Sequence, residues 1–123
     1  MATICDIDGT LLRNGTQPIQ KVIDYVNSLS GSLIIVTGRN VSQRKETAAA
    51  LHKAGVKYSR LIMNPGSSAE TAKFKYEVGM RLKGSVNLAI DNNVTMRAAY
   101  AKAGIPTKDP AKLPDMKKFW TIF

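Results

Sequence analysis

Five short apolar runs alternate with amphipathic stretches along the chain, and this alternation constrains the fold more than any other feature. The apolar runs cover residues 3–6, 32–36, 60–63, 86–90 and 105–107, and each has the length and composition of a buried strand. Strands that alternate with helices form a parallel sheet with helices packed on both faces. The sequence therefore predicts an α/β fold, a Rossmann-like three-layer sandwich with a mainly parallel five-stranded sheet.

Four helices are expected between these strands, over residues 18–28, 41–54, 68–82 and from just after 93 to 104. The first places apolar residues at the i, i+3, i+4, i+7 spacing of one buried helix face. Glycines at the ends of the second and fourth are typical helix terminators.

The 123 residues are predicted to form a single domain, with a core over residues 2–107 and a basic, aromatic tail over 108–123. The aromatic end of the tail is expected to pack back on the domain or, alternatively, to bind a partner. Cys5 and His52 are the only cysteine and histidine, so disulfides, cysteine metal cages and Ser-His-Asp chemistry have no support. The chain has neither an apolar run long enough to span a membrane nor the pattern of a signal peptide, so a cytoplasmic location is expected.

Polar residues follow several of the expected strands. Asp6 and Asp8 flank the end of the first strand, the segment 37–39 (Thr-Gly-Arg) ends the second, and Asp91 ends the fourth. Because the carboxyl ends of parallel strands meet at one edge of a sheet, these side chains are expected to converge. Two carboxylates so close repel each other unless a cation lies between them, and Mg²⁺ is the natural partner for such hard oxygen ligands.

Four segments resemble, in order, the four motifs of the haloacid dehalogenase (HAD) superfamily. They are residues 6–12 (Asp-Ile-Asp-Gly-Thr-Leu-Leu), 36–39 (Val-Thr-Gly-Arg), Lys75, and 88–92 (Leu-Ala-Ile-Asp-Asn). Within the superfamily, the pattern is similar to the phosphatase domain of bacteriophage polynucleotide kinase. The resemblance implies a HAD-like phosphatase fold over residues 2 to about 107.

The resemblance also implies a mechanism. Asp6 would attack phosphorus and form an aspartyl-phosphate, and Asp8 would act as general acid and then general base. An acid at position 8 is typical of the phosphatases of the superfamily. The implied phosphate-binding residues are Thr37, Gly38, Arg39 and Lys75, and the implied Mg²⁺ ligands are Asp6, Asp8 through its backbone carbonyl, and Asp91.

Two lysines of the third helix compete for the phosphate-binding role. The apolar stripe of this helix is formed by Phe74, Val78 and Leu82. At about 100° per residue, Lys75 lies roughly 60° from the centre of the stripe and Lys73 roughly 140°. Lys75 is therefore predicted to reach over the edge of the sheet, whereas Lys73 faces solvent.

Arg39 and Asn92 each raise a further question. Arg39 either pairs with a nearby acid or carbonyl, or uses its planar fork to bind phosphate, and the resemblance favours phosphate. Asn92 stands where many relatives carry a second acid, so it adds no charge to the metal site.

The segments where relatives insert cap domains are short, so the site is expected to be open and essentially capless. Residues 12–16 fit only a small hairpin flap, because Asn14-Gly15 is a tight-turn signal, and residues 64–68 fit only a loop. The net charge of +9 attracts polyanions. Together these features favour a Mg²⁺-dependent phosphomonoesterase acting on nucleic-acid ends or nucleotides. The alternatives are a small-metabolite phosphatase capped by an oligomer partner, and a non-catalytic basic module that binds polyanions.

Overall fold

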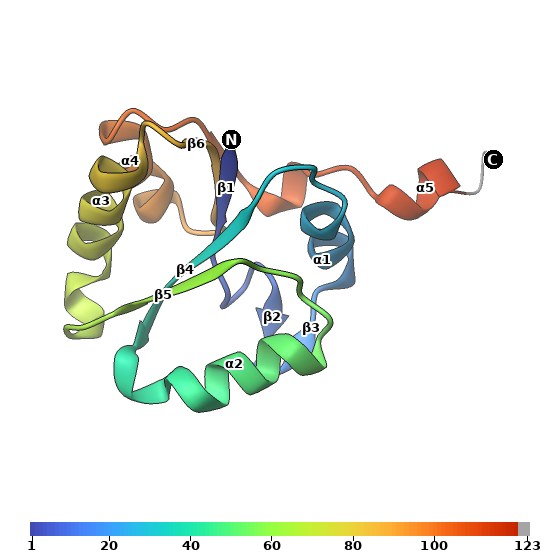
Figure 1. The fold of residues 1–123 in the computed structure, drawn as a ribbon, viewed down its shortest axis with the longest axis horizontal. Coiled ribbons are helices and arrows are strands. Elements are labelled where there is room, and N and C mark those ends of the chain that lie inside the picture. Colours follow the sequence, from blue (N-terminus) through green and yellow to red (C-terminus); the bar gives the residue numbers. More distant parts are fainter. Residues whose placement is uncertain (121–123) are drawn as a thin grey trace.

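The central sheet of the protein has five parallel strands (Figure 1). The computed structural model describes the backbone of residues 1–120 and the side chains of residues 1–118. In spatial order the strands are β5 (Arg60–Asn64), β4 (Leu33–Asn40), β1 (Ala2–Cys5), β6 (Val86–Ile90) and β7 (Thr107–Lys108). All four neighbouring pairs run parallel, as expected from the alternation of strands and helices.

Helices cover both faces of the sheet. Helices α1 (Gln20–Asn27) and α2 (Arg44–Lys53) pack on one face, and α3 (Thr71–Leu82) and α4 (Val94–Lys102) on the other (Figure 1). Successive strand residues point to opposite faces, so Ile35 belongs to the core on the α1–α2 side and its neighbour Ile34 to the core on the α3–α4 side. The three-layer α/β sandwich predicted from the sequence is confirmed.

The second strand of the chain is longer than the sequence predicts. β4 continues for four residues past Val36, through Thr37 to Asn40, and pairs irregularly with β5 over this extension. These four residues lack an apolar alternation, which is why the sequence pattern ends the strand early. The next two expected helices each begin with a 3₁₀ turn, η1 (Val41–Gln43) and η2 (Ser68–Glu70), and each turn is fixed by a capping box.

The two connections where a cap domain could be inserted are short. Between β1 and α1 lies a hairpin of β2 (Leu12–Arg13) and β3 (Gln17–Pro18). Its turn requires positive φ at Asn14 (51°) and Gly15 (83°), which these residue types tolerate best. Only a short loop and η2 separate β5 from α3. The carboxyl edge of the sheet is therefore covered by no domain at either place.

The tail continues from β7 into η3 (Pro110–Lys112) and the short helix α5 (Met116–Trp120). Leu113 is buried in the α1–α2 core, so this part of the tail is packed against the domain. The predicted packing of the aromatic end concerns side chains 119–123, which lie outside those described. Among residues 1–120, no helix combines the length and the apolar character needed to cross a membrane.

Candidate active site

The carboxyl ends of the sheet strands open into a cleft of about 490 Å³. Six of its lining residues come from the motif segments of the sequence, and a seventh is the lysine chosen from helix phase. They are Asp6, Asp8, Gly38, Arg39, Asp91, Asn92 and Lys75. Residues far apart in the chain meet here because their strands are parallel and neighbouring, as the topology β4-β1-β6 requires.

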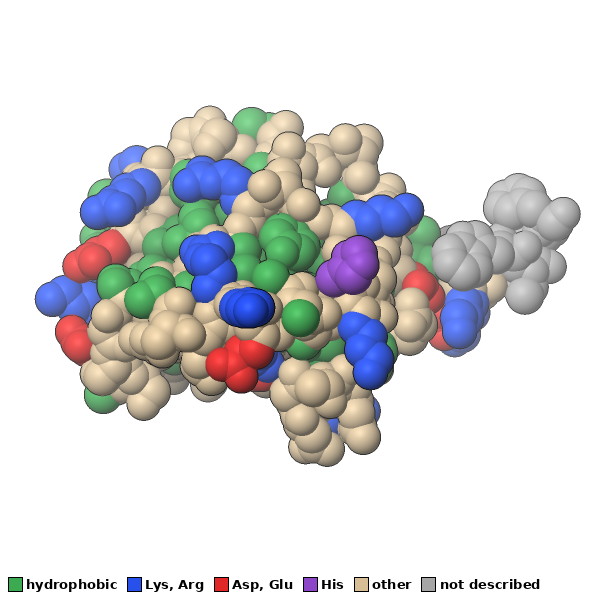
Figure 2. Space-filling view, turned by 60° about the horizontal axis from the view of Figure 1, so that its bottom comes forward, with side chains coloured by type: hydrophobic (Ala, Val, Ile, Leu, Met, Phe, Trp, Pro, Cys, Tyr) green, Lys and Arg blue, Asp and Glu red, His purple; other side chains and the backbone are tan. Residues whose placement is uncertain are grey.

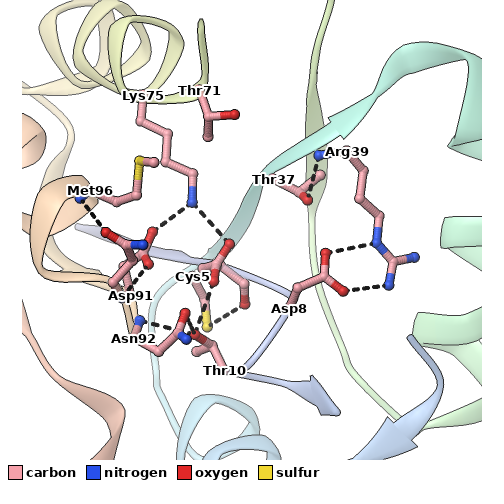
Figure 3. A network of polar contacts seen from close by, with 12 residues as sticks. Cys5, Asp8, Thr10, Thr37, Arg39, Thr71, Lys75, Asp91, Asn92 and Met96 are labelled. Atoms are coloured by element: carbon pink, nitrogen blue, oxygen red, sulfur yellow. Dashed lines mark hydrogen bonds and ion pairs between the residues drawn. The ribbon is translucent and has the colours of Figure 1, made fainter. Parts of the chain in front are cut away.

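A buried ion-pair network forms the floor of the cleft. Lys75 Nζ lies 2.9 Å from Asp6 Oδ1 and 2.6 Å from Asp91 Oδ2. Figure 3 shows the lysine reaching down from its helix toward Asp91. The three residues are 2%, 7% and 1% exposed for Lys75, Asp6 and Asp91, so their charges interact at short range with little screening by water. Two carboxylates against one ammonium leave the network with a net negative charge.

Helix α3 positions Lys75 over the edge of the sheet. Lys75 is buried whereas Lys73, two residues earlier, is exposed, in keeping with their phases relative to the apolar stripe. The first turn of the helix approaches β4 closely, because a Cβ on Gly38 would lie only 2.8 Å from Thr71 Cγ2. Glycine at position 38 therefore allows the close packing that brings Lys75 over the sheet.

Burial changes the proton affinity of the network. Removal of Asp6 from water raises its pKa from 3.8 to about 6, even though Lys75 and the hydroxyl of Thr10 act in the opposite direction. Burial lowers the pKa of Lys75, but the facing carboxylates Asp6 and Asp91 outweigh it and the net shift is upward. The lysine is thus held charged between two acids, one of which is reluctant to ionise.

The second oxygen of Asp6 is bound by two polar groups from the neighbouring loops. The Thr10 hydroxyl donates to Asp6 Oδ2 at 3.1 Å and accepts a bond from the Asn92 backbone N–H at 3.2 Å. With its amide nitrogen turned toward these oxygens, Asn92 donates to Asp6 Oδ2 at 3.0 Å and to the Asp8 carbonyl oxygen at 3.1 Å. Gly9, with φ of 78°, leaves room for this amide, since a Cβ there would collide with it.

Asp8 lies at the mouth of the cleft and faces Arg39 rather than Lys75 (Figure 3). Arg39 Nε donates to Asp8 Oδ2 at 3.0 Å and Nη2 donates to Asp8 Oδ1 at 2.8 Å, a bidentate pair. The side chain of Asp8 is 54% exposed and that of Arg39 only 15%. The hydrogen bonds from Arg39 to Asp8 are the main reason that the pKa of the guanidinium is raised.

Arg39 also contacts the hairpin and the second helix. Its Nη2 donates to the Gly15 carbonyl at 3.2 Å and its Nη1 to Thr47 Oγ1 at 3.3 Å. Four of the five N–H groups of a guanidinium are thereby used within the protein. Of the two roles considered for Arg39, this structure places it in a pairing with an acid, and contact with a phosphate would require it to exchange these partners.

The remaining predicted phosphate-binding residue, Thr37, is fully buried in β4 and is not among the cleft-lining residues. Its hydroxyl accepts a bond from the Arg39 backbone N–H at 3.1 Å. Thr71, which the sequence analysis did not single out, does line the cleft. Thr71 and Lys75 are spaced i and i+4 on one helix face, and this spacing is the signal that could have found it.

The floor of the cleft offers oxygen ligands for a divalent cation. Within residues 1–118, no three His, Cys, Asp or Glu side chains converge as a metal site. The Asp8 side chain is turned to Arg39, so only its backbone carbonyl remains on the side of Asp6 and Asn92. The two buried carboxylates and this carbonyl are hard oxygen donors, and the net negative charge of the network favours a cation beside them. The donor set therefore fits Mg²⁺, with one carboxylate fewer than relatives that carry an acid at position 92.

The comparisons with known proteins bear on the fold and the family. Two chains in structures of the Pnkp1/Rnl/Hen1 RNA repair complex superpose with TM-scores of 0.68 and 0.61, each at 21% identity. The alignments cover 88% of this chain, which spans only 41% and 45% of the two neighbours. At this identity the likeness shows the fold alone. No curated protein sequence matches significantly.

The sequence profile of the haloacid dehalogenase-like hydrolases matches residues 3–85. The match includes Asp6, Asp8 and Lys75 and ends before Asp91. It covers two thirds of the sequence, and the sheet order and the converging strand ends agree with the superfamily resemblance stated from the four motifs. The chain therefore belongs to the haloacid dehalogenase-like hydrolase family.

Proposed function

We propose that the protein is a Mg²⁺-dependent phosphomonoesterase that works through an aspartyl-phosphate on Asp6. The observation that carries the proposal is the position of Asp6, whose buried carboxylate forms an ion pair with Lys75 in the floor of an open cleft. Asp8, two residues later, lies at the mouth of the same cleft. Membership of a hydrolase family supports the reaction class. A carboxylate nucleophile with a second acid beside the leaving group is the arrangement that two-step ester hydrolysis needs.

In the proposed first step, an Asp6 oxygen forms a bond to phosphorus and the bond from phosphorus to the leaving oxygen breaks. Asp8 gives its proton to that oxygen. In the second step, Asp8 takes a proton from a water molecule, which attacks the phosphoryl group and releases phosphate and Asp6. Lys75 lies where it can stabilise the phosphoryl oxygens. Thr71 lines the cleft beside it, with its hydroxyl donating to the Ser68 carbonyl at 2.7 Å.

Asp6, Asp91 and the Asp8 carbonyl would hold Mg²⁺, with Asn92 beside them. When bound, the ion supplies positive charge that offsets the repulsion between the attacking carboxylate and the phosphoryl group. Thr10 and Asn92 orient Asp6 by hydrogen bonds to its second oxygen. Asn93, whose backbone N–H donates to Asp91 Oδ1 at 3.0 Å, fixes the other carboxylate.

The proposed substrate is a phosphate on a nucleic-acid end or a nucleotide. No domain covers the cleft, so a phosphate attached to a large molecule can enter. The chain carries 18 basic and 9 acidic residues, and Lys and Arg side chains are spread over the face drawn in Figure 2. The fold is shared with chains of an RNA repair complex, which is consistent with a nucleic-acid substrate.

The test is a phosphatase panel with and without Mg²⁺, on a generic aryl phosphate, nucleotides, and 3′- and 5′-phosphorylated oligonucleotides. Wild-type protein is expected to release phosphate only with Mg²⁺. Asp6→Asn is expected to lower turnover by at least about a thousandfold on every substrate. The matched control is Glu77→Gln, an exposed acid on α3 outside the cleft. Absence of phosphate release from every ester would refute the proposal.

A further inference from the structure

A second pocket, of about 230 Å³, lies next to the active site. It is bounded by the β2–β3 hairpin, the start of α1 and the segment that follows β7. Thr10 and Asn92, which bind the second oxygen of Asp6, also line this pocket, and Asn92 lines the active-site cleft as well. The two hollows are therefore separated by little more than the amide that contacts the nucleophile.

The pocket lies at the same carboxyl edge of the sheet as the active site, because its lining includes Thr10 and Asn92, from the loops that follow β1 and β6, and Asp109, which follows β7. Asp8, the proposed proton donor to the leaving oxygen, pairs with Leu12 through an isolated bridge. Arg13 is the next residue of β2, and its side chain is exposed whereas that of Leu12 is buried. Arg13 is thus exposed on the hairpin that follows Asp8, and it lines a hollow that adjoins the active-site cleft.

The basic side chains of the pocket have little to bind within the protein. Within the described part of the chain, the Arg13 guanidinium has no hydrogen bond or ion pair, and Lys21 Nζ donates only to the Ala111 carbonyl at 3.2 Å. The one acid of the pocket, Asp109, is 3.9 Å from Arg97 Nη2 and caps the Ala111 N–H at 3.0 Å. The charge that remains available in the pocket is therefore positive.

We propose that this pocket binds a backbone phosphate of the strand whose end is dephosphorylated, with Arg13 and Lys21 as its ligands. The inference rests on the proposed function and specifies its substrate class as an oligonucleotide. A phosphodiester carries a single negative charge, which the exposed Arg13 and the half-buried Lys21 attract without base recognition. A mononucleotide has no second phosphate in the leaving group, so it does not use this pocket.

The experiment measures binding, so that it does not depend on turnover. Fluorescence anisotropy compares short single-stranded oligonucleotides, phosphorylated at the 3′ or the 5′ end, in the Asp6→Asn background, and mononucleotides compete as the second ligand. Arg13→Ala and Lys21→Ala are each expected to weaken oligonucleotide binding by about fivefold to tenfold and to lower the salt slope by about one. Mononucleotide affinity is expected to stay unchanged, and Arg13→Lys is expected to restore most of the oligonucleotide affinity.

The matched control is Lys83→Ala, an exposed lysine that follows the far end of α3. If Arg13→Ala and Lys21→Ala weaken oligonucleotide binding no more than Lys83→Ala does, or weaken both ligands equally, the pocket is not a backbone-phosphate site. Thermal unfolding of each variant shows whether the fold is retained. Arg13→Ala, which removes no side-chain hydrogen bond or ion pair of the described residues, decides the matter if Lys21→Ala is unstable. Failure of the proposed function would appear separately, as a wild-type protein that hydrolyses no ester.

Discussion

Asp6 and Asp8 are the same residue type, two positions apart, yet they lie in opposite surroundings. Asp6 is 7% exposed and is bound by a lysine that it shares with another carboxylate. The Asp8 side chain is 54% exposed and is held by a bidentate arginine. Pairs of carboxylates whose environments differ in this way can divide nucleophilic and acid–base roles between them. The contrast shows that the cation each acid meets, and the water around it, distinguishes two residues that the sequence presents alike.

The two cations differ in ways that suit their places. Lys75 presents a compact charge that can lie between Asp6 and Asp91 at 2.9 and 2.6 Å in a space from which water is excluded. Arg39 presents a planar fork that fits one carboxylate and still reaches Gly15 and Thr47. Lys75 therefore offsets part of the charge of two buried carboxylates, whereas Arg39 fixes the direction of Asp8 and links it to the hairpin.

The largest expected effect is from Lys75→Met, which leaves two buried carboxylates without their cation. We expect the free energy of unfolding to fall by about 3–5 kcal/mol, because an unpaired buried charge is strongly destabilising. Denaturant unfolding of the metal-free protein measures this loss, and phosphatase activity should disappear as well. Lys73→Met is the matched control, since Lys73 is exposed on the same helix. An equally small loss of stability in both variants would show that Lys75 does not stabilise the fold by pairing with Asp6 and Asp91.

Asp8→Asn should leave stability nearly unchanged and impair chemistry. The ion pair is half exposed, so its loss is expected to cost at most about 1 kcal/mol. The rate with an alkyl or nucleoside phosphate should fall by about 100- to 10,000-fold, because the leaving oxygen needs a proton. An aryl phosphate with an acidic leaving group should lose far less. Equal losses of rate on the two ester types in steady-state assays would show that Asp8 is not the proton donor to the leaving oxygen.

The buried half of the site (Asp6, Lys75 and Asp91) can be predicted from the sequence more directly than the exposed half (Asp8 and Arg39). Asp6 and Asp91 end apolar runs that belong to neighbouring parallel strands, and Lys75 borders the apolar stripe of its helix. Each of these positions depends on local periodicity, which a single sequence records. The strand order itself brings them together once the α/β pattern is established.

The exposed half depends on contacts that no local pattern records. Arg39 lies in the irregular extension of β4, and its partners come from the loop after β1, the hairpin and α2. Whether an arginine at a strand end meets an acid or a ligand is decided by how these three segments close around it. The amide of Asn92 is a similar case, since its contacts with Asp6 and the Asp8 carbonyl depend on the space left by Gly9.

The smallest expected effect is a dependence of protein stability on pH and Mg²⁺ that arises from the buried carboxylate of Asp6. The folded pKa of Asp6, about 6, exceeds its ordinary value of 3.8, so protonated Asp6 favours the folded state. This contribution is present below about pH 4 and is lost as the pH rises through 6; at 1.36 kcal/mol per pKa unit it amounts to at most about 3 kcal/mol.

Metal-free protein should therefore lose stability between pH 4 and 6 relative to Asp6→Asn, which does not titrate at this position. Mg²⁺ should restore the difference at pH 7, because cation and proton compete for the same carboxylate. Activity should show the same competition, falling as the pH drops through 6 at low Mg²⁺, with this limb moving to lower pH as Mg²⁺ increases. Thermal unfolding of the two proteins across this range, with and without Mg²⁺, measures the linkage. If stability changed with pH in the same way in both metal-free proteins, burial would not raise the pKa of Asp6. The contrast between Asp6 and Asp8 would then rest on geometry alone.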